Sequence, residues 1–123
     1  MLKEKIFQFS EEITNDIDWI CITKESAETL GETGSFIYAA FNGEQCLYVG
    51  ESGSSLNARF KKDGSAHCYK DWYKDVTEVR YFKWESDELP MKERKLLEQA
   101  VSLIYQPEHY GKIGRPKKII GSE

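Results

Sequence analysis

The sequence contains four side chains whose types could form a hydrolytic site: Tyr38, Tyr48, Arg59 and Glu98. Arginine carries a fixed positive charge and a planar fork that matches phosphate oxygens. Glutamate is a hard oxygen ligand for Mg²⁺ or Mn²⁺, ions that often use only one or two carboxylates. A phenol has a pKa of ~10 in water, so either tyrosine could take a proton from water only beside a cation. Together these groups could perform metal-assisted hydrolysis of a phosphodiester.

The same residues lie in short motifs that follow one another in a recognisable order. The order is Phe36-Ile37-Tyr38, Tyr48-Val49-Gly50, Arg59, Glu98 and Pro107. This set resembles the GIY-YIG endonuclease family, in which the first triplet is usually Gly-Ile-Tyr and the second Tyr-Ile-Gly or Tyr-Val-Gly. The resemblance runs from about Gly34 to about Tyr110, which is most of the chain.

The resemblance implies a divalent-metal-dependent endonuclease that nicks or cuts DNA in repair, restriction or mobile-element systems. The catalytic residues that it implies are Tyr38, Tyr48, Arg59 and Glu98. Glu98 would be the ligand of Mg²⁺ or Mn²⁺, and either tyrosine could be the base while the other positions the phosphate. Restriction-type members often carry a histidine one turn after the arginine, where this chain has Asp63, so His67 is the candidate substitute.

Three positions depart from the family pattern. Phe36 replaces the first glycine, a change that a strand tolerates because such a glycine mainly permits close backbone approach. Glu51 follows the second triplet where many members carry lysine, which reverses a charge near the expected phosphate site. Tyr110 stands where asparagine is common. These changes favour, as the alternative, a catalytically inactive nucleic-acid-binding module of the same fold, and a third interpretation is an unrelated α+β interaction domain.

Glu98 can be placed on its helix by a helical wheel. The wheel predicts a buried stripe of Leu97, Ala100, Val101 and Ile104, widened by Leu96 and Leu103. Glu98 falls on the opposite flank, at the border between core and solvent. That border suits a metal ligand that faces a cleft, and it equally suits a solvated carboxylate paired with Arg94 or Lys95 one turn back.

The helices and strands expected around these residues indicate one α+β domain with a small three-stranded antiparallel sheet flanked by helices. Aromatic and β-branched residues on both sides of Asn42-Gly43 predict a hairpin. The other expected elements are a helix from Ser54 or Ser55 to about Lys62, a strand over 76–84 and a helix from Pro90 to about Tyr105.

Hairpin geometry sets a condition on the two tyrosines. A simple two-residue turn at Asn42-Gly43 would place Tyr38 opposite Leu47, and the two tyrosines would point to opposite faces of the sheet. An odd-length turn with Gly43 in the left-handed region, or a bulge in either arm, would return them to one face. We therefore predict such an irregularity.

Residues 1–33 are expected to be an N-terminal extension that packs on the domain of residues 34–110. Weak alternation over 5–9 predicts a strand, residues 18–22 predict another, and Thr23 is positioned to cap a short helix over 25–30.

The net charge of −4 opposes nucleic-acid binding, but the basic residues are unevenly distributed. The residues expected to contact nucleic acid are Lys61, Lys62, Arg115, Lys117 and Lys118. The last three lie in a basic tail over 111–123, where Gly114-Arg115-Pro116 resembles the core of an AT-hook, a minor-groove binder. Recognition of a particular DNA site would need loops, this tail, a homodimer or a partner protein.

Composition predicts a cytoplasmic globular protein. A chain of 123 residues suits one domain, and 40% hydrophobic with 31% charged residues argues against disorder. No apolar run approaches a membrane span, and the amino terminus lacks the pattern of a signal peptide. Three cysteines without a C-x-x-C pair argue against a disulfide framework and against a structural zinc site.

Overall fold

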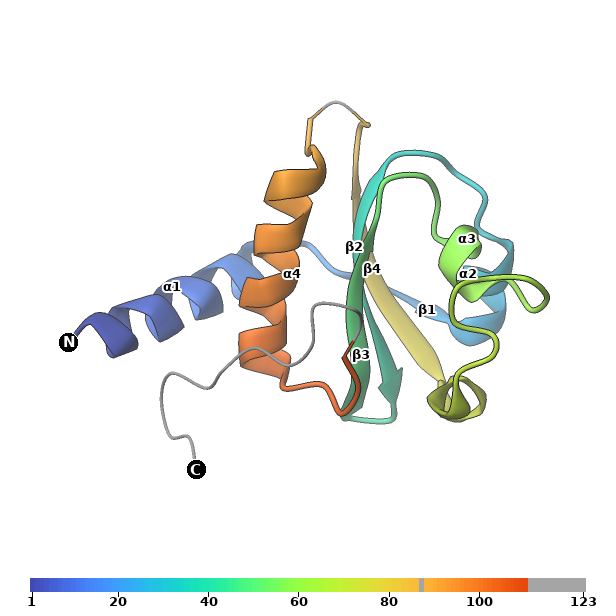
Figure 1. Cartoon of the computed structure of the whole chain (residues 1–123), viewed down its shortest axis with the longest axis horizontal. Coiled ribbons are helices and arrows are strands. Elements are labelled where there is room, and N and C mark those ends of the chain that lie inside the picture. The colour runs from blue at the N-terminus through green and yellow to red at the C-terminus, as the bar shows by residue number, and fades with distance from the viewer. Residues whose placement is uncertain (87, 111–123) are drawn as a thin grey trace.

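The fold is built on an antiparallel sheet with the strand order β1-β4-β2-β3 (Figure 1). The structure is a computed structural model that describes residues 1–86 and 88–110. Its elements are α1 (Leu2–Asp16), β1 (Ile20–Thr23), α2 (Lys24–Thr29), β2 (Ser35–Asn42), β3 (Gln45–Ser52), α3 (Asn57–Phe60), the 3-10 helix η1 (Asp71–Asp75), β4 (Glu78–Trp84) and α4 (Met91–Tyr105). The α+β class is confirmed.

The sheet has four strands where three were predicted. The additional strand, β1, comes from the N-terminal extension and pairs antiparallel with β4, from Ile20 opposite Tyr81 to Thr23 opposite Glu78. Strand β4 pairs with β2 on its other side, so β1 satisfies backbone groups that would otherwise form an open edge. The residue that ends β1, Thr23, caps α2 as predicted, because its hydroxyl accepts from the Ser26 amide.

Helices cover both faces of the sheet. Figure 1 shows α4 on one side, with α1 packed across it, and α2 and α3 on the other side. Alternate residues of β2 divide between two cores. Phe36 and Tyr38 belong to the core beneath α2, α3 and η1, whereas Ile37 and Ala39 belong to the core beneath α4.

The hairpin between β2 and β3 contains the predicted irregularity. Phe41 pairs with Cys46, but Ala40 pairs with Tyr48, so Leu47 is an extra residue in β3. Gly43 takes the left-handed conformation in the turn, with φ of 62°. Because Tyr38 pairs with Gly50 beyond the bulge, Tyr38 and Tyr48 lie on the same face. The predicted bulge is confirmed.

The prediction of a strand over 5–9 is wrong, since these residues belong to α1. A five-residue alternation is too short to separate a strand from a helix, and contacts with α4 favour the helix. Ser10 and Thr14, four residues apart, form the buried face of α1, where the Thr14 hydroxyl donates to the Ser10 carbonyl at 2.9 Å.

The helix predicted to reach Lys62 is also shorter in the structure. It begins at Asn57, with Leu56 and not Ser54 or Ser55 at the N-cap position, although the Ser55 hydroxyl accepts from the Ala58 amide at 3.3 Å. It ends at Phe60, since the chain folds back and later amides bond to its carbonyls: Ala66 donates to Ala58, and His67 donates to Arg59, both at 3.2 Å.

Helix α4 has nearly the predicted bounds, beginning after Pro90 and ending at Gln106 in the left-handed region. Val101 and Leu103 are buried as the wheel predicts, whereas Leu96 is exposed. Leu96 lies at the edge of the contact between α4 and α1, where it lines an apolar groove between the two helices.

We predict that Gly50→Ala destabilises the hairpin. A Cβ at Gly50 would lie 2.9 Å from Tyr48 Cε2 and closer still to the hydroxyl end of Tyr38, so both rings would have to move. Overpacking of this kind costs about 1–3 kcal/mol of unfolding free energy, which urea denaturation would measure. Gly31→Ala is the matched control, because its nearest neighbour is the Asn57 side chain at 3.5 Å. Equal stability of the two variants would contradict the prediction.

Candidate active site

The backbone hydrogen bond from His67 to Arg59 brings two predicted site residues together. Arg59 is on α3, and His67 is in the loop that follows. The loop therefore holds the imidazole beside the last turn of the helix, although the two residues are eight positions apart in sequence.

His67 in turn contacts both tyrosines of the hairpin. Its Nε2 lies 2.7 Å from the Tyr38 hydroxyl, and its ring meets the Tyr48 ring edge-on at a centroid distance of 4.7 Å. Tyr38 is 1% exposed and His67 is 4% exposed, so this hydrogen bond is shielded from water. Tyr48 is only half-buried and is the more accessible of the two phenols.

Glu98 approaches the tyrosines from α4, beyond strand β3. Strand β3 is at the edge of the sheet, so a side chain from α4 can reach its outer side. The Glu98 side chain is 16% exposed, and Lys95 Nζ lies 3.7 Å from its Oε1. Its charge contributes to the raised pKa values of both Tyr38 and Tyr48. The structure thus brings together Tyr38, Tyr48, Arg59, His67 and Glu98.

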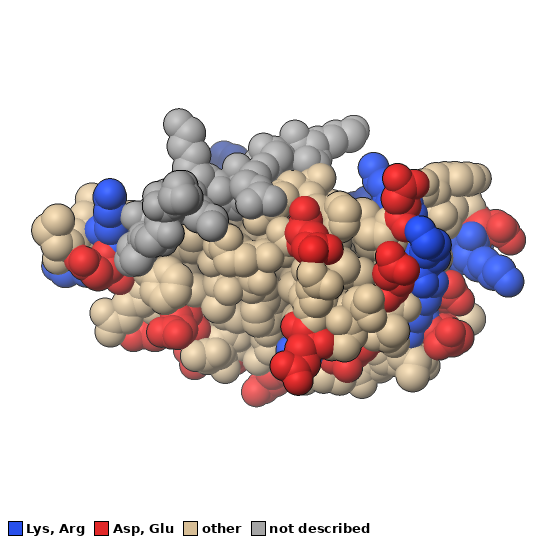
Figure 2. Space-filling model, turned by 90° about the horizontal axis from the view of Figure 1, so that it is seen from below, with Lys and Arg blue, Asp and Glu red and all other residues tan. Residues whose placement is uncertain are grey.

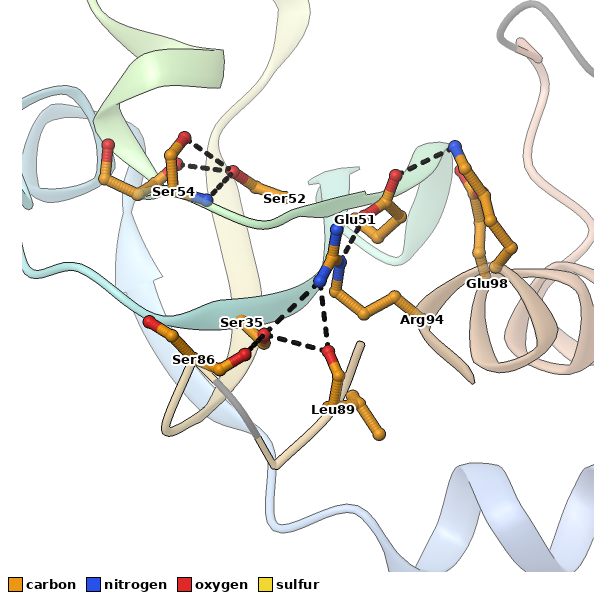
Figure 3. A network of polar contacts seen from close by, with 10 residues as sticks. Ser35, Glu51, Ser52, Ser54, Ser86, Leu89, Arg94 and Glu98 are labelled. Carbon is orange, nitrogen blue, oxygen red and sulfur yellow. Dashed lines mark hydrogen bonds and ion pairs between the residues drawn. The ribbon is translucent and has the colours of Figure 1, made fainter. Parts of the chain in front are cut away.

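The charge of Glu51 is neutralised by α4 (Figure 3). Arg94 Nε donates to one Glu51 oxygen at 2.6 Å, and Lys95 Nζ lies 2.8 Å from the other oxygen. Burial alone would raise the pKa of Glu51, but the hydrogen bonds from these two cations outweigh it and lower the pKa. Glu51 is therefore no unpaired negative charge in front of the site. Arg94 pairs with Glu51, which leaves Lys95 as the closer neighbour of Glu98.

Arg94 also joins two other segments, the start of β2 and the connection that precedes α4. Its Nη1 donates to the Leu89 carbonyl at 3.0 Å and to the Ser35 hydroxyl at 3.4 Å. The Ser35 hydroxyl donates to the carbonyl of Leu89 at 2.9 Å. These roles of Arg94, Glu51 and Ser35 were missed at the sequence level, because the partners are 43 and 59 residues apart and no local spacing links them.

Three buried side-chain polar atoms among the described residues have no hydrogen-bond partner: Arg59 Nε, His67 Nδ1 and Glu98 Oε1. Buried polar groups are nearly always paired, because an unpaired one keeps its full desolvation cost. Glu98 Oε1 still has an ion-pair neighbour, Lys95 Nζ at 3.7 Å. All three atoms belong to residues that the sequence motifs had marked, and the charge of Arg59 acts on both His67 and Glu98.

The electrostatics favour the neutral forms of both tyrosines and of His67. Burial first, and then neighbouring Tyr48, raises the pKa of Tyr38. Burial followed by the charge of Glu98 raises the pKa of Tyr48, whereas Arg59 lowers it. Burial and then Arg59 lower the pKa of His67 to about 4, so its imidazole is neutral at neutral pH. Burial raises the pKa of Glu98, against the opposing effect of Lys95.

A divalent cation would need ligands from the side chains of this site. Within residues 1–86 and 88–110, no group of three or more His, Cys, Asp or Glu side chains is placed to hold a metal ion. Mg²⁺ does not require such a cage, since it commonly binds one or two carboxylates, water and substrate phosphate. Glu98, with one buried oxygen that lacks a partner, fits that mode of binding.

An aromatic stack beside the site was not expected from the sequence. Trp72 stacks on Tyr48 with ring centroids 5.0 Å apart, and His109 stacks near the same indole at 6.0 Å. The His109 amide bonds to the Leu47 carbonyl at the bulge, which fixes the segment after α4 against β3. This stack restrains the Tyr48 ring in addition to its contacts with Tyr38 and His67.

Of the residues predicted to contact nucleic acid, two lie in the described part of the chain and three lie outside it. Lys61 and Lys62 are exposed directly after α3, close in sequence to Arg59. Arg115, Lys117 and Lys118 lie outside the described residues, as does the AT-hook-like tripeptide. Figure 2 shows the described basic and acidic side chains intermixed at the end that carries α2 and α3, so this face has no patch of a single sign.

Comparisons with family models, with curated proteins and with solved structures returned no match to this chain. No described helix is both long enough and apolar enough to cross a membrane.

We predict that His67 makes folding stability depend on pH between 6.5 and about 4. The unfolded chain binds the proton more tightly than the folded chain, so stability is complete above pH 6.5 and falls as the pH approaches 4. The loss corresponds to about 3 kcal/mol. Urea denaturation of wild type and His67→Gln at several pH values would isolate it, because the carboxyl groups titrate in both. Parallel pH profiles would contradict the prediction, and NMR titration of the His67 ring would give the pKa directly.

We predict that Arg94→Met lowers the free energy of unfolding by about 3–5 kcal/mol, because it leaves the buried Glu51 carboxylate with Lys95 alone. The double variant Arg94→Met/Glu51→Gln should lose less than the sum of the single losses, since the unpaired charge is then removed. Lys92→Met, in the same helix and exposed, is the matched control in denaturant unfolding. Additive losses would show that the pair is uncoupled.

Proposed function

We propose that the chain is a divalent-metal-dependent endonuclease that hydrolyses phosphodiester bonds in DNA. The observation that carries this proposal is the concentration of unpaired buried atoms on Arg59, His67 and Glu98. A guanidinium nitrogen, an imidazole nitrogen and a carboxylate oxygen held without partners are suited to a ligand with both anionic oxygens and a cation. A metal-bound phosphate group has that composition.

Arg59 supplies the positive charge for the phosphate. Its Nε is buried without a partner, and the guanidinium keeps its charge at every relevant pH. Negative charge builds on the phosphate oxygens in the transition state, and a fixed cation beside them stabilises it more than it stabilises the ground state. Arg59 also lowers the pKa of both tyrosines, so it favours loss of their protons.

Tyr48 is the phenol assigned to the attacking water. It is half-buried, and its hydroxyl has no hydrogen bond with a described residue, whereas the Tyr38 hydroxyl is committed to His67. The Tyr48 ring is held by contacts with the rings of Tyr38, His67 and Trp72. Tyr38 and His67 are therefore positioning residues in this proposal.

Glu98 would hold Mg²⁺ or Mn²⁺ through the oxygen that has no hydrogen bond. When bound, the ion would supply a Lewis acid for the phosphate and for the leaving oxygen. The Glu98 charge raises the pKa of Tyr48, so neutralisation of that charge would lower this pKa and favour the phenolate, the form that can take a proton from water. Glu51 supports Glu98 indirectly, because it engages Arg94 and Lys95 and draws their charge toward β3.

We predict that purified protein nicks supercoiled plasmid with Mg²⁺ or Mn²⁺ and not with EDTA. Arg59→Ala, Glu98→Gln and Tyr48→Phe should each lower the nicking rate by roughly 100-fold or more, because each removes a group that acts in the transition state. Glu44→Gln, in the exposed hairpin turn, is the control for Glu98→Gln and should keep the full rate.

Two outcomes would contradict this proposal. DNA binding without cleavage under any of these conditions would support an inactive nucleic-acid-binding module instead. Metal-dependent nicking that survives in Glu98→Gln would place the metal elsewhere, even though the chain were a nuclease.

A further inference from the structure

Helix α1 exposes a stripe of large apolar side chains. Leu2 is 72% exposed and Phe9 is 63% exposed, and Ile6 lies between them on the same face. The spacing of Leu2, Ile6, Phe9 and Ile13 continues this face along the helix. The inner face of α1, with Ser10 and Thr14, packs on α4, so the apolar stripe is left without a partner in the described part of the chain.

The stripe borders an apolar groove that α1 forms with α4. The groove has a volume of about 660 Å³, and its lining includes Ile6, Phe9, Ile13, Trp84, Leu89 and Leu96. The N-terminal half of α1 projects beyond α4, so the stripe is open to a second molecule (Figure 1). An apolar surface of this kind on a soluble domain marks an interaction site.

The charges of α1 are separated along its length. Lys3, Lys5 and the amino terminus are at its beginning, whereas Glu11, Glu12 and Asp16 are in its second half. This order is unfavourable for an isolated helix, because its dipole favours acidic residues at the beginning and basic residues at the end. None of these five side chains makes an ion pair within the described residues, where the amino terminus pairs only with Glu4.

The same charge order becomes favourable when two copies of α1 lie antiparallel. Lys5, Glu12 and Asp16 flank the apolar stripe on one side of the helix, so Lys5 of one copy then faces Glu12 and Asp16 of the other, and the apolar stripes meet beside them. A parallel arrangement would place like charges together. Self-complementarity of one surface is the requirement of an isologous dimer, in which the same patch serves both partners.

We propose that the apolar groove between α1 and α4 is a dimer interface that receives α1 of a second copy of this chain in antiparallel orientation. The twofold axis passes near Phe9, which lies midway between the basic and acidic halves. The interface uses α4, the helix that also carries Glu98, but its lining includes none of the candidate active-site residues. Its existence therefore does not depend on the proposed nuclease activity.

The test is the association state of the full chain, measured by sedimentation equilibrium at low and high micromolar concentration. Wild type should be dimeric at high concentration, and Phe9→Glu should raise the dissociation constant by roughly 100-fold or more, because it removes a central apolar anchor. Tyr69→Glu, which changes an exposed aromatic residue in the loop before η1, should leave association unchanged. Circular dichroism would show that each variant is folded.

A charge exchange tests the orientation. Lys3→Glu/Lys5→Glu and Glu11→Lys/Glu12→Lys should each be monomeric alone, and a mixture of the two should form heterodimers. Phe9→Cys in a Cys21→Ser background should form an intermolecular disulfide across the twofold axis. A wild-type monomer at every concentration would overturn the proposal, as would a dimer that Phe9→Glu leaves intact. Dimerisation without heterodimer rescue would overturn the antiparallel arrangement.

Discussion

The buried ion pair between Arg94 and Glu51 is the interaction on which the position of α4 depends. It joins the first turn of α4 to the end of β3, and through Leu89 and Ser35 it also holds the connection from β4 and the start of β2. Removal of both charges from water carries a large cost, which the pair offsets only because its geometry is good and Lys95 adds a third charge. An apolar contact could stabilise the packing of α4 to a comparable extent, but it would not fix one rotation of the helix about its own axis. Since Glu98 is one turn after Arg94 on the same helix, that rotation decides whether Glu98 faces Tyr48 or solvent.

Considered alone, Glu51 is a negative charge where the resembling family usually has lysine. In the structure its two oxygens bond to two cations of α4, so the local charge balance is restored from another element. The two cations then have different roles. Arg94 is fully engaged with Glu51 and the neighbouring carbonyl, while Lys95 lies between Glu51 and Glu98 and is half-exposed. The substitution at position 51 and the basic pair at 94 and 95 therefore have to be interpreted together.

Local patterns predicted what local forces determine. The hairpin, its bulge, the strand that became β4 and the bounds of α4 all follow from turn chemistry, side-chain alternation and helix-end signals within a few residues. The elements that were predicted incorrectly depend on tertiary contacts. Residues of α1 form a helix whose inner face packs on α4. Helix α3 ends early because the amides of residues 66 and 67 donate hydrogen bonds to its carbonyls. The approach of Tyr38 to His67 and of Arg94 to Glu51 spans 29 and 43 residues. The motif order suggested the first of these contacts, and no pattern indicated the second.

The bulge at Leu47 links the register of the hairpin to the difference between the two tyrosines. One extra residue in β3 moves Tyr48 to the face of Tyr38, and the pairing of Tyr38 with Gly50 leaves no side chain between the two rings. The bulge also presents the carbonyl of Leu47 to the amide of His109, which brings His109 onto Trp72 beside Tyr48. Tyr38 is thereby enclosed with His67, whereas Tyr48 packs on Trp72 and is half-buried. Two side chains that look equivalent in the sequence thus differ in burial and in hydrogen bonding, although one inserted residue places both on the same face of the sheet.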